Sequence, residues 1–333
     1  MLTHGRRRFL RDSLSLVGVG LLSGCAMLPT SAPHSATMAR IGVLGTWPSL
    51  DNSYIGAFKA GLRDLGYIEG INVSFDYRFA RGDISRLPGL AAELVDLQVD
   101  VIATHAQGVP AARRATPTIP IVMLVFADAV AGGLIESLAH PGGNVTGSTI
   151  FNAELMAKRL ELLKGVIPSL RKAAVLLNPS YPLNGAFLDA MATTANALGM
   201  TVHPFEARES ADFEGAVATM GEQGMEGLVL HDDPLFVVNT TPITALAAKD
   251  RLASVGFLEA ARSGGLMAYG VEFPDLYRRA AYFVDRILKG AKPADLPVER
   301  ATTFKLVVNL AAAQGLGLTV PTAVLQQAIE VIQ

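Results

Sequence analysis

The sequence lacks the cysteines and histidine clusters on which many folds and catalytic sites depend. Cys25 is the one cysteine among 333 residues, which excludes an intrachain disulfide and the common thiolate zinc sites. The histidines show no spacing typical of metal ligands; they are His4, His34, His105, His140, His203 and His231. We therefore expect neither a disulfide framework nor a resident metal.

The chain also lacks an excess of charge of either sign. It has 28 Lys and Arg against 30 Asp and Glu, for a formal net charge of −2, and no basic tract follows residue 25. Because nucleic-acid binding needs clustered Lys and Arg to neutralise phosphates, we expect no nucleic-acid partner. No later apolar run reaches the ~20 residues that a membrane-spanning helix needs.

Motifs of common enzyme classes are absent as well. The sequence has no G-x-x-x-x-G-K-[ST] phosphate loop, no G-x-G-x-x-G after a strand, no H-E-x-x-H and no G-x-S-x-G. The glycine-rich segment from Pro141 to Gly147 lacks the lysine of a phosphate loop, so we interpret it as a tight turn. We expect no catalytic residue and no cofactor, although an unfamiliar active site stays open as an alternative.

What is present begins with an N-terminal segment that has the composition of an export signal. A basic cluster from Arg6 to Arg11 precedes an apolar stretch from Leu14 to Leu22 and the small residues Ser23 and Gly24, the order of a cleaved secretory signal. The tetrad L-S-G-C that ends at Cys25 resembles the lipobox of bacterial lipoproteins, in which the cysteine carries the lipid. The arginines also resemble a twin-arginine signal, although a glycine precedes them where that motif usually has Ser or Thr.

These features predict an exported, membrane-anchored protein. Residues 1–25 would be an export signal with a lipobox, and residues 26–39, which are small, polar and proline-containing, would form a flexible tether. The lipid on Cys25 would hold the protein in the periplasm or at the outer face of a bacterial membrane. The alternative is an ordinary buried cysteine in an apolar N-terminal helix.

The rest of the chain repeats one order of strands and helices. One copy begins with I-G-V-L-G-T-W-P-S-L at 41–50, continues with a helix whose apolar positions include Ile55, Phe58 and Leu62, and ends in an alternating strand at 71–79. The other begins at 173–182, continues through a helix that ends near 198, and enters a strand at 201. Further apolar strands at 99–105 and 227–233 follow the copies. This pattern predicts an α/β fold with two doubly wound parallel-sheet lobes joined by a hinge.

The carboxyl ends of the predicted strands nominate a binding site, because ligands of open parallel sheets bind there. Two facing lobes would bring these ends around one cleft suited to a small polar or zwitterionic solute. The candidate ligand-binding residues from this rule are Thr46, Trp47, His105, Gln107, Phe126, Asp128, Asn178, Asp233, Glu259 and Glu272.

Several of these residues have a structural alternative. Trp47 would bury its area as readily in the core, and His105 would serve as a hydrogen-bonded structural histidine. Asp128 and Asp233 would cap helices by accepting from backbone amides. Asp232 and Asp233 are not expected to form a general acid/base pair, since adjacent side chains on an extended strand point to opposite faces.

Several segments resemble one protein family. They are L-I-E-S-L-A-H-P-G-G-N-V-T-G at 134–147, D-D-P-L-F from 232, and the C-terminal segments G-G-L-M-A-Y-G and G-L-G-L-T-V-P. All of them resemble the ABC transporter substrate-binding proteins of the tryptophan/tyrosine type, over essentially all of residues 40–333. The resemblance implies a periplasmic-binding-protein type I-like fold, whose lobes close on a small solute and deliver it to a permease driven by a separate ATPase.

The resemblance also implies roles for particular residues. The solute would be an aromatic or other amino acid, and Asp128 or Asp233 would meet its ammonium group. Trp47, Phe126 or Phe236 would stack on an apolar part of the solute. A protein of this kind binds and releases its solute unchanged, so we expect no enzymatic activity.

The order of the segments predicts where the chain passes between the lobes. Lobe 1 would comprise residues 40–149 plus about 275–300, and lobe 2 residues 150–274 plus about 301–333, with crossovers near 149–152, 270–274 and 300–303. Hinge closure on the solute would let the permease distinguish the loaded form. Two alternatives stay open: a ligand-sensing protein and an exported α/β enzyme on the same scaffold.

Overall fold

The chain's computed structural model describes residues 38–47, 53–181 and 183–333. The expected export signal, the lipidation site Cys25 and nearly all of the expected tether lie outside the described residues. Residues 38–333 form one unit. Within the described residues, no helix combines the length and the apolar composition needed to cross a membrane.

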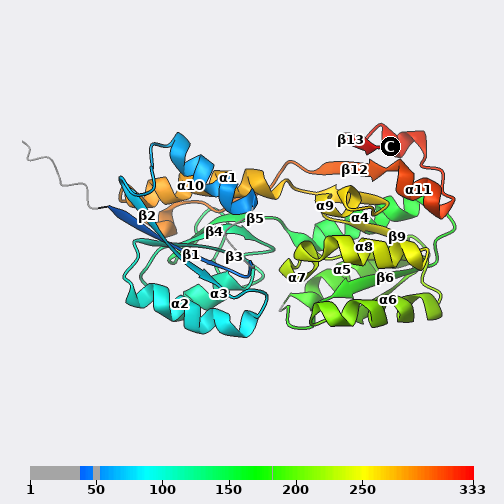
Figure 1. Ribbon diagram of the computed structural model, residues 1–333, viewed down its shortest axis with the longest axis horizontal. Helices are drawn as coiled ribbons and strands as arrows, with labels where there is room; N and C mark the ends of the chain where they lie inside the picture. Colours follow the sequence, from blue (N-terminus) through cyan, green and yellow to red (C-terminus); the bar gives the residue numbers. More distant parts are fainter. Residues whose placement is uncertain (1–37, 48–52, 182) are drawn as a thin grey trace, which may run out of the picture. The chain divides into compact units, whose positions relative to one another are not determined.

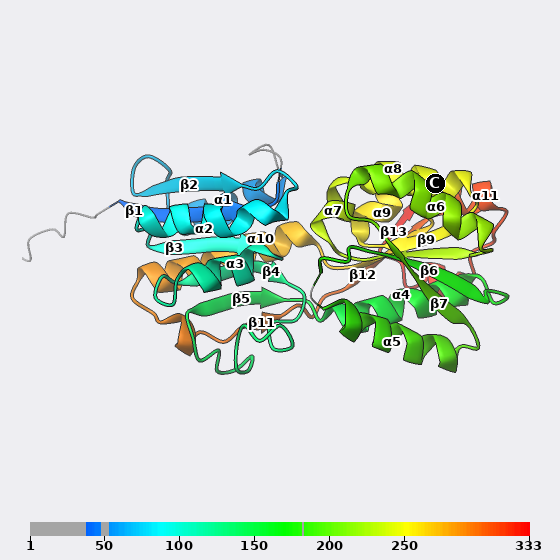
Figure 2. The same cartoon turned by 90° about the horizontal axis from the view of Figure 1, so that it is seen from below.

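The first sheet is parallel throughout and, in the described residues, has six strands in the order β11-β5-β4-β3-β1-β2. Figure 2 shows these strands side by side. Its central strands are apolar and buried on both faces, as parallel strands covered by helices must be. The strands are β1 (Ala39–Gly45), β2 (Val73–Phe79), β3 (Val101–His105), β4 (Ile121–Phe126), β5 (Val145–Thr149) and β11 (Glu299–Arg300).

Helices cover both faces of this sheet. One face carries α1 (Ser53–Asp64) and α10 (Phe273–Leu288), which pack against each other although they are far apart in the sequence (Figure 1). A Cβ on Gly61 of α1 would lie 2.5 Å from the Arg278 carbonyl oxygen of α10, so only glycine permits this close approach. The other face carries η1 (Ile84–Arg86), α2 (Leu87–Asp96) and α3 (Gly108–Ala115). We call this sheet with its helices the first lobe.

The second sheet has, among the described residues, seven strands in the order β13-β12-β10-β9-β8-β6-β7. Its pairs are parallel except for β10 with β12. The exception has a topological cause, because the chain returns from β11 of the first sheet and enters β12 at the carboxyl end of β10. The strands are β6 (Lys172–Leu177), β7 (Thr201–Glu206), β8 (Gly227–Leu230), β9 (Ala253–Gly256), β10 (Met267–Gly270), β12 (Lys305–Asn309) and β13 (Glu330–Ile332).

The second lobe consists of this sheet and the helices that pack on it. Its largest contact between helices joins α4 to α5, which cover one face with an apolar cluster around Leu160, Val175 and Phe187. The helical segments of this lobe are α4 (Asn152–Val166), α5 (Asn184–Ala197), η2 (Ser210–Asp212), α6 (Phe213–Glu222), α7 (Pro234–Val238), α8 (Thr240–Lys249), α9 (Leu258–Arg262), α11 (Leu310–Leu316) and α12 (Thr322–Leu325). A further turn, η3 (Pro293–Asp295), precedes β11.

The two lobes repeat one topology. The order β2-β1-β3-β4-β5 in the first sheet matches β7-β6-β8-β9-β10 in the second, which confirms the repeat and the α/β class expected from the sequence. Three strands are shorter than expected, because β2 begins at Val73 after a turn, β3 begins at Val101 and β8 ends at Leu230. The chain passes between the sheets after β5, after β10 and after β11.

Candidate ligand-binding site

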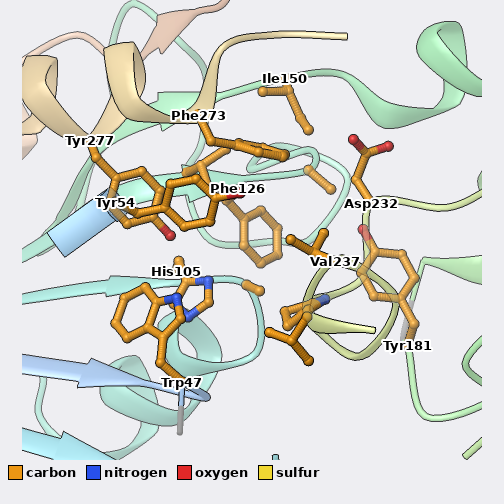
Figure 3. A pocket seen from close by; sticks show the side chains of 15 residues that line it. Trp47, Tyr54, His105, Phe126, Ile150, Tyr181, Asp232, Val237, Phe273 and Tyr277 are labelled. Atoms are coloured by element: carbon orange, nitrogen blue, oxygen red, sulfur yellow. The ribbon is translucent and has the colours of Figure 1, made fainter. Parts of the chain in front are cut away.

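A cavity of about 80 Å³ lies where the carboxyl ends of strands from both sheets meet. Its lining is dominated by aromatic and aliphatic side chains, and we call it the aromatic cavity. Figure 3 shows ten of its lining residues around a common space. The lining residues are Trp47, Tyr54, His105, Ala106, Val125, Phe126, Ala127, Ile150, Tyr181, Asp232, Pro234, Val237, Val238, Phe273 and Tyr277.

Strand ends supply part of this lining, as the sequence rule expected. Trp47 follows β1, while His105 and Phe126 are the last residues of β3 and β4. From the second lobe, Tyr181 follows β6 and Asp232 follows β8. The doubly wound fold therefore brings segments from opposite halves of the chain to one point.

An aromatic wall on the first-lobe side has fixed geometry. The rings of Trp47 and His105 stack with centroids 4.1 Å apart and planes inclined by 10°. Tyr54 lies 5.3 Å from Tyr277 and 5.9 Å from Phe273, between ring centroids. Such interlocked rings lose little conformational freedom when they meet a flat apolar group, so the wall suits an aromatic or branched side chain.

His105 brings no positive charge to this wall. Its ring is buried, the Thr46 amide donates to its Nε2 at 3.4 Å, and burial lowers the pKa of His105 to about 3. The imidazole is therefore neutral at physiological pH and acts as a flat partner for Trp47.

Asp232 is the charged residue among the described residues that line the cavity, and its charge is balanced. Arg159 of α4 has a side chain that is 0% exposed, and its two terminal nitrogens donate to the two Asp232 carboxylate oxygens. The same guanidinium donates to the carbonyl oxygens of Leu230 at 2.9 Å and Tyr269 at 2.8 Å. The pair is thus rigid and locally neutral, and Asp232 lies at the wall of the cavity (Figure 3).

A second, polar cavity of about 530 Å³ adjoins the first and shares Pro234 and Val238 with it. Four of the expected site residues line this polar cavity: Thr46, Gln107, Asn178 and Asp233. Gln107 Nε2 of the first lobe donates to Asp233 Oδ2 of the second at 3.2 Å. The contact joins the two lobes beside the aromatic cavity.

Asp233 is a helix cap. Its Oδ1 accepts from the Leu235 amide at 2.8 Å at the start of α7. This is the capping role that the sequence offered as the structural alternative for Asp233. Asn178 Nδ2 lies 3.4 Å from both of its oxygens. Burial raises the pKa of Asp233, and the hydrogen bonds from Leu235, Asn178 and Gln107 offset part of that rise.

Two of the remaining expected residues line neither cavity. Asp128 Oδ1 accepts from the Val130 and Ala131 amides in a turn. Glu272 pairs with Arg262 and Lys305.

Phe236 and Glu259 also lie outside both linings. The expected stacking of Phe236 on a solute needs correction: the ring is 0% exposed and packs on Phe213, because α7 turns it into the core. Glu259 instead joins the lobes, since Oε1 accepts from the Tyr54 hydroxyl at 2.9 Å.

Several lining residues were not expected from the sequence. Tyr54, Phe273 and Tyr277 come from the helices α1 and α10, which a rule about strand ends does not address. Asp232 is the neighbour of the nominated Asp233. The alternation of side chains along an extended strand predicts only that the two carboxylates point to opposite faces, and it does not say which residue lines the cavity. A signal was available for Phe273, which directly follows the nominated Glu272 and lies three residues after the end of β10.

The described residues hold no cluster of three or more His, Cys, Asp or Glu side chains that could bind a metal ion. The lining of the aromatic cavity presents aromatic rings, tyrosine hydroxyls and one carboxylate that is paired with Arg159.

Comparison with known proteins assigns the family. The family model described as ABC transporter substrate binding protein matches residues 41–332. The chain belongs to the ABC transporter substrate-binding protein family. The resemblance seen in the sequence is thereby confirmed, together with the periplasmic-binding-protein type I-like fold class.

Three relatives are similar to this substrate-binding protein over 88% of its chain. It is 28% identical over 305 residues to a "Tyrosine-binding protein" of Clostridioides difficile (strain R20291), with 88% of this chain and 87% of that protein covered. It is 27% identical to the ABC domain from Streptococcus pneumonia solved in complex with L-Trp, with a TM-score of 0.81 and coverage of 88% and 99%. A conserved domain protein from Vibrio cholerae O1 biovar El Tor is 28% identical, with a TM-score of 0.82 and the same coverage.

Proposed function

We propose that this substrate-binding protein is the extracytoplasmic component of an ABC importer and captures an amino acid with an aromatic or other apolar side chain. The observation that carries the proposal is the aromatic cavity, which draws its lining from both lobes. Relatives named for tyrosine binding or solved with L-Trp support the solute class. The permease and its ATPase are the partners that the family implies.

Capture would proceed by hinge closure. A solute that touches Trp47 or Tyr277 in the first lobe and Tyr181 in the second makes all of its contacts only when the lobes are together. Such differential contact favours the closed form. The hydrogen bonds from Tyr54 to Glu259 and from Gln107 to Asp233 would add to closure from the protein's side.

Export and anchoring complete the proposal. Residues 1–25 would direct export, and a lipid on Cys25 would tether the protein to a membrane outside the cytoplasm, where an importer's binding protein meets its solute. The lobes would comprise residues 40–149 with about 275–300 and residues 150–274 with about 301–333, the division in which the hinge segments cross at the carboxyl ends of the strands.

The test is native mass spectrometry of the purified protein before and after mild unfolding, followed by thermal shift with aromatic amino acids, branched amino acids, nucleosides and small amides. We expect a stoichiometric small molecule that leaves unchanged, rebinds when added and raises the melting temperature. A compound that emerges chemically altered would replace this function by an enzymatic one. If no amino acid raises the melting temperature, the solute assignment is wrong.

A matched pair of variants ties binding to the cavity. Phe273→Leu keeps an apolar side chain in the lining but removes a ring, and we expect weaker binding by about 1 kcal/mol. Phe304→Leu makes the same change at a ring that packs on Tyr269 in the second lobe, outside both cavity linings. Its affinity should equal that of the wild type.

A further inference from the structure

A cluster of exposed apolar side chains lies at the amino ends of β1 and β2, the edge of the first sheet opposite to the aromatic cavity. Met38 directly precedes β1, and the other members lie in the turn that joins α1 to β2. The Ala39 amide donates to the Asn72 carbonyl oxygen at 3.0 Å, so the two segments are adjacent. Apolar side chains that cluster on a surface mark a contact with another molecule or a membrane. We call this cluster the apolar patch; its members are Met38, Leu65, Ile68 and Ile71, which are 42–70% exposed.

The turn that carries the patch is held in a fixed shape. Asn72 Oδ1 accepts from the Ile68 amide at 2.7 Å, and Asn72 Nδ2 donates to the Gly66 carbonyl oxygen at 2.9 Å. The Tyr67 hydroxyl donates to Asp285 at 3.1 Å, which ties the turn to the last helical turn of α10. The exposure of the patch is therefore built into the local fold.

Unpaired positive charge accompanies the patch. Figure 1 shows that α1 and α10 end at the same end of the first lobe at which β1 begins. The three acidic residues in the turn and in these helix ends are each paired with a cation: Glu69 with Lys59, Asp64 with Arg278 and Asp285 with Lys289. The exposed cations Arg63, Arg286 and Lys292 form no ion pair with another described residue. Apolar side chains with free cations beside them complement a layer of anionic lipid headgroups.

The N-terminal part of the chain favours a membrane as the occupant of the patch. Residues 26–37 separate the proposed lipid site Cys25 from Met38, and this length spans at most about 40 Å when fully extended. A membrane that holds the lipid is thus within reach of the patch, so a contact too weak to hold a free protein becomes populated. Other occupants match the charge poorly. Residues 26–37 contain no Asp or Glu, and a second copy would bring the same unpaired cations together.

We propose that the apolar patch docks on a membrane surface that contains anionic lipid, with Ile68 and Ile71 entering the boundary between headgroups and acyl chains. The inference rests on the proposed lipid anchor at Cys25 and goes beyond the proposed function, because it names the face of the protein that meets the membrane. The strands of the first sheet run from this face towards the aromatic cavity. Docking therefore leaves the cavity on the side away from the lipid, where the anchored protein meets its solute.

Site-specific fluorescence tests the docking. Cys25 is the one cysteine of the sequence, so an added cysteine is the single free thiol of the mature protein lipidated at Cys25. This protein with Ile71→Cys would be labelled with nitrobenzoxadiazole and reconstituted into vesicles of equal parts phosphatidylethanolamine and phosphatidylglycerol. Ile329→Cys is the matched control, because Ile329 is a 59% exposed isoleucine of the second lobe. We expect spin-labelled lipid to quench the label at position 71 and to leave the label at position 329 unquenched.

Variants with the label at position 71 test the two kinds of contact. Ile68→Ser should lower the ratio of docked to undocked protein by about fivefold, because an apolar side chain no longer leaves water. Arg286→Gln should lower the ratio by about fivefold in the same vesicles and should have no effect in vesicles of phosphatidylcholine alone. Ile329→Ser is the control for Ile68→Ser and should leave the ratio unchanged. All three replaced side chains are exposed, so the melting temperature should equal that of the wild type.

The outcomes separate this inference from the proposed function. Equal quenching at positions 71 and 329, or no quenching at 71 in protein that floats with the vesicles, overturns the inference; solute binding is measured by titration on the same preparation and stands or falls independently. Emission at 71 that changes with protein concentration but is not quenched by lipid shows that a second copy covers the patch, which also overturns the inference. If Cys25 carries no lipid and the protein does not float, the proposed anchor fails together with the inference.

Discussion

The hydrogen bond between Tyr54 and Glu259 gives the sharpest test of hinge closure. It joins α1 of the first lobe to α9 of the second at 2.9 Å. Glu259 is largely buried, its other carboxylate oxygen has no hydrogen-bond partner among the residues that the structure describes, and burial raises the pKa of Glu259. In the proposed open form water would solvate this carboxylate, so the Tyr54 hydroxyl would stabilise the closed form in particular.

The expected magnitude of a Tyr54→Phe change follows from that difference. A hydrogen bond to a charged group contributes about 1.5–3 kcal/mol, which corresponds to a shift of about tenfold to a hundredfold in the equilibrium between closed and open forms. If the solute binds the closed form, its apparent dissociation constant rises by up to the same factor. The ring itself is retained, so contacts with Phe273 and Tyr277 persist.

The assay pairs calorimetric titration with small-angle X-ray scattering, with and without the amino acid that binds best. Tyr67→Phe is the control. It removes a hydroxyl that donates to the Asp285 carboxylate, and both residues lie in the first lobe. We expect Tyr54→Phe to weaken binding and to give a larger radius of gyration in the ligand-free protein. The control should lose stability but keep wild-type affinity. Unchanged affinity and unchanged scattering in Tyr54→Phe would refute the role of this contact in closure.

Three further predictions concern stability. Arg159→Met leaves the buried Asp232 unpaired and should lower the free energy of unfolding in urea by about 3–5 kcal/mol; the double variant Arg159→Met/Asp232→Leu should recover most of the loss, and no recovery would contradict the ion-pair account. Burial lowers the pKa of His231 from 6.5 to about 4, so below pH 6.5 the unfolded chain takes up a proton that the folded chain excludes. The same sign applies to His105, so stability should be full above pH 6.5 and fall towards pH 4 by about 3 kcal/mol for each of the two histidines. His231→Leu should remove about half of this slope, and a His231→Leu variant that keeps the whole slope would show that His231 does not cause it. Gly147→Ala should cost about 3 kcal/mol or more, since Gly147 has φ +126° and a Cβ there would lie 2.3 Å from a carbonyl oxygen of β4; Gly143→Ala, with no atom within 4 Å of the added Cβ, should unfold like the wild type.

Much of the site could be anticipated because strand ends are visible in a sequence. Trp47, His105 and Phe126 follow or end apolar strands, and all three line the aromatic cavity. The physical reason is that parallel strands end at a common edge, whatever covers their faces. The cap at Asp233 was also foreseeable, because a carboxylate before Pro234 at the start of a helix satisfies orphan amides.

Helix packing placed the residues that were missed. Tyr54 and Tyr277 meet in the cavity because α1 and α10 pack tightly, and that packing depends on a contact as local as the missing Cβ of Gly61. Nothing in either helix alone indicates which partner it meets. The same is true of Arg159, a residue in the middle of α4 that its own turn of helix does not distinguish from a surface arginine.

The sequence by itself determined the family, the α/β class, the repeated strand order and the edge of each sheet where a solute would bind, because apolar periodicity and strand ends are local properties. The tertiary structure decided which carboxylate at that edge is paired with an arginine and which one caps a helix. Alternation separates Asp232 from Asp233, but only the packed fold sets Arg159 against the first and a helix amide against the second. Both partners come from distant parts of the chain, and this is why one carboxylate pairs with a buried arginine beside the cavity while its neighbour caps a helix.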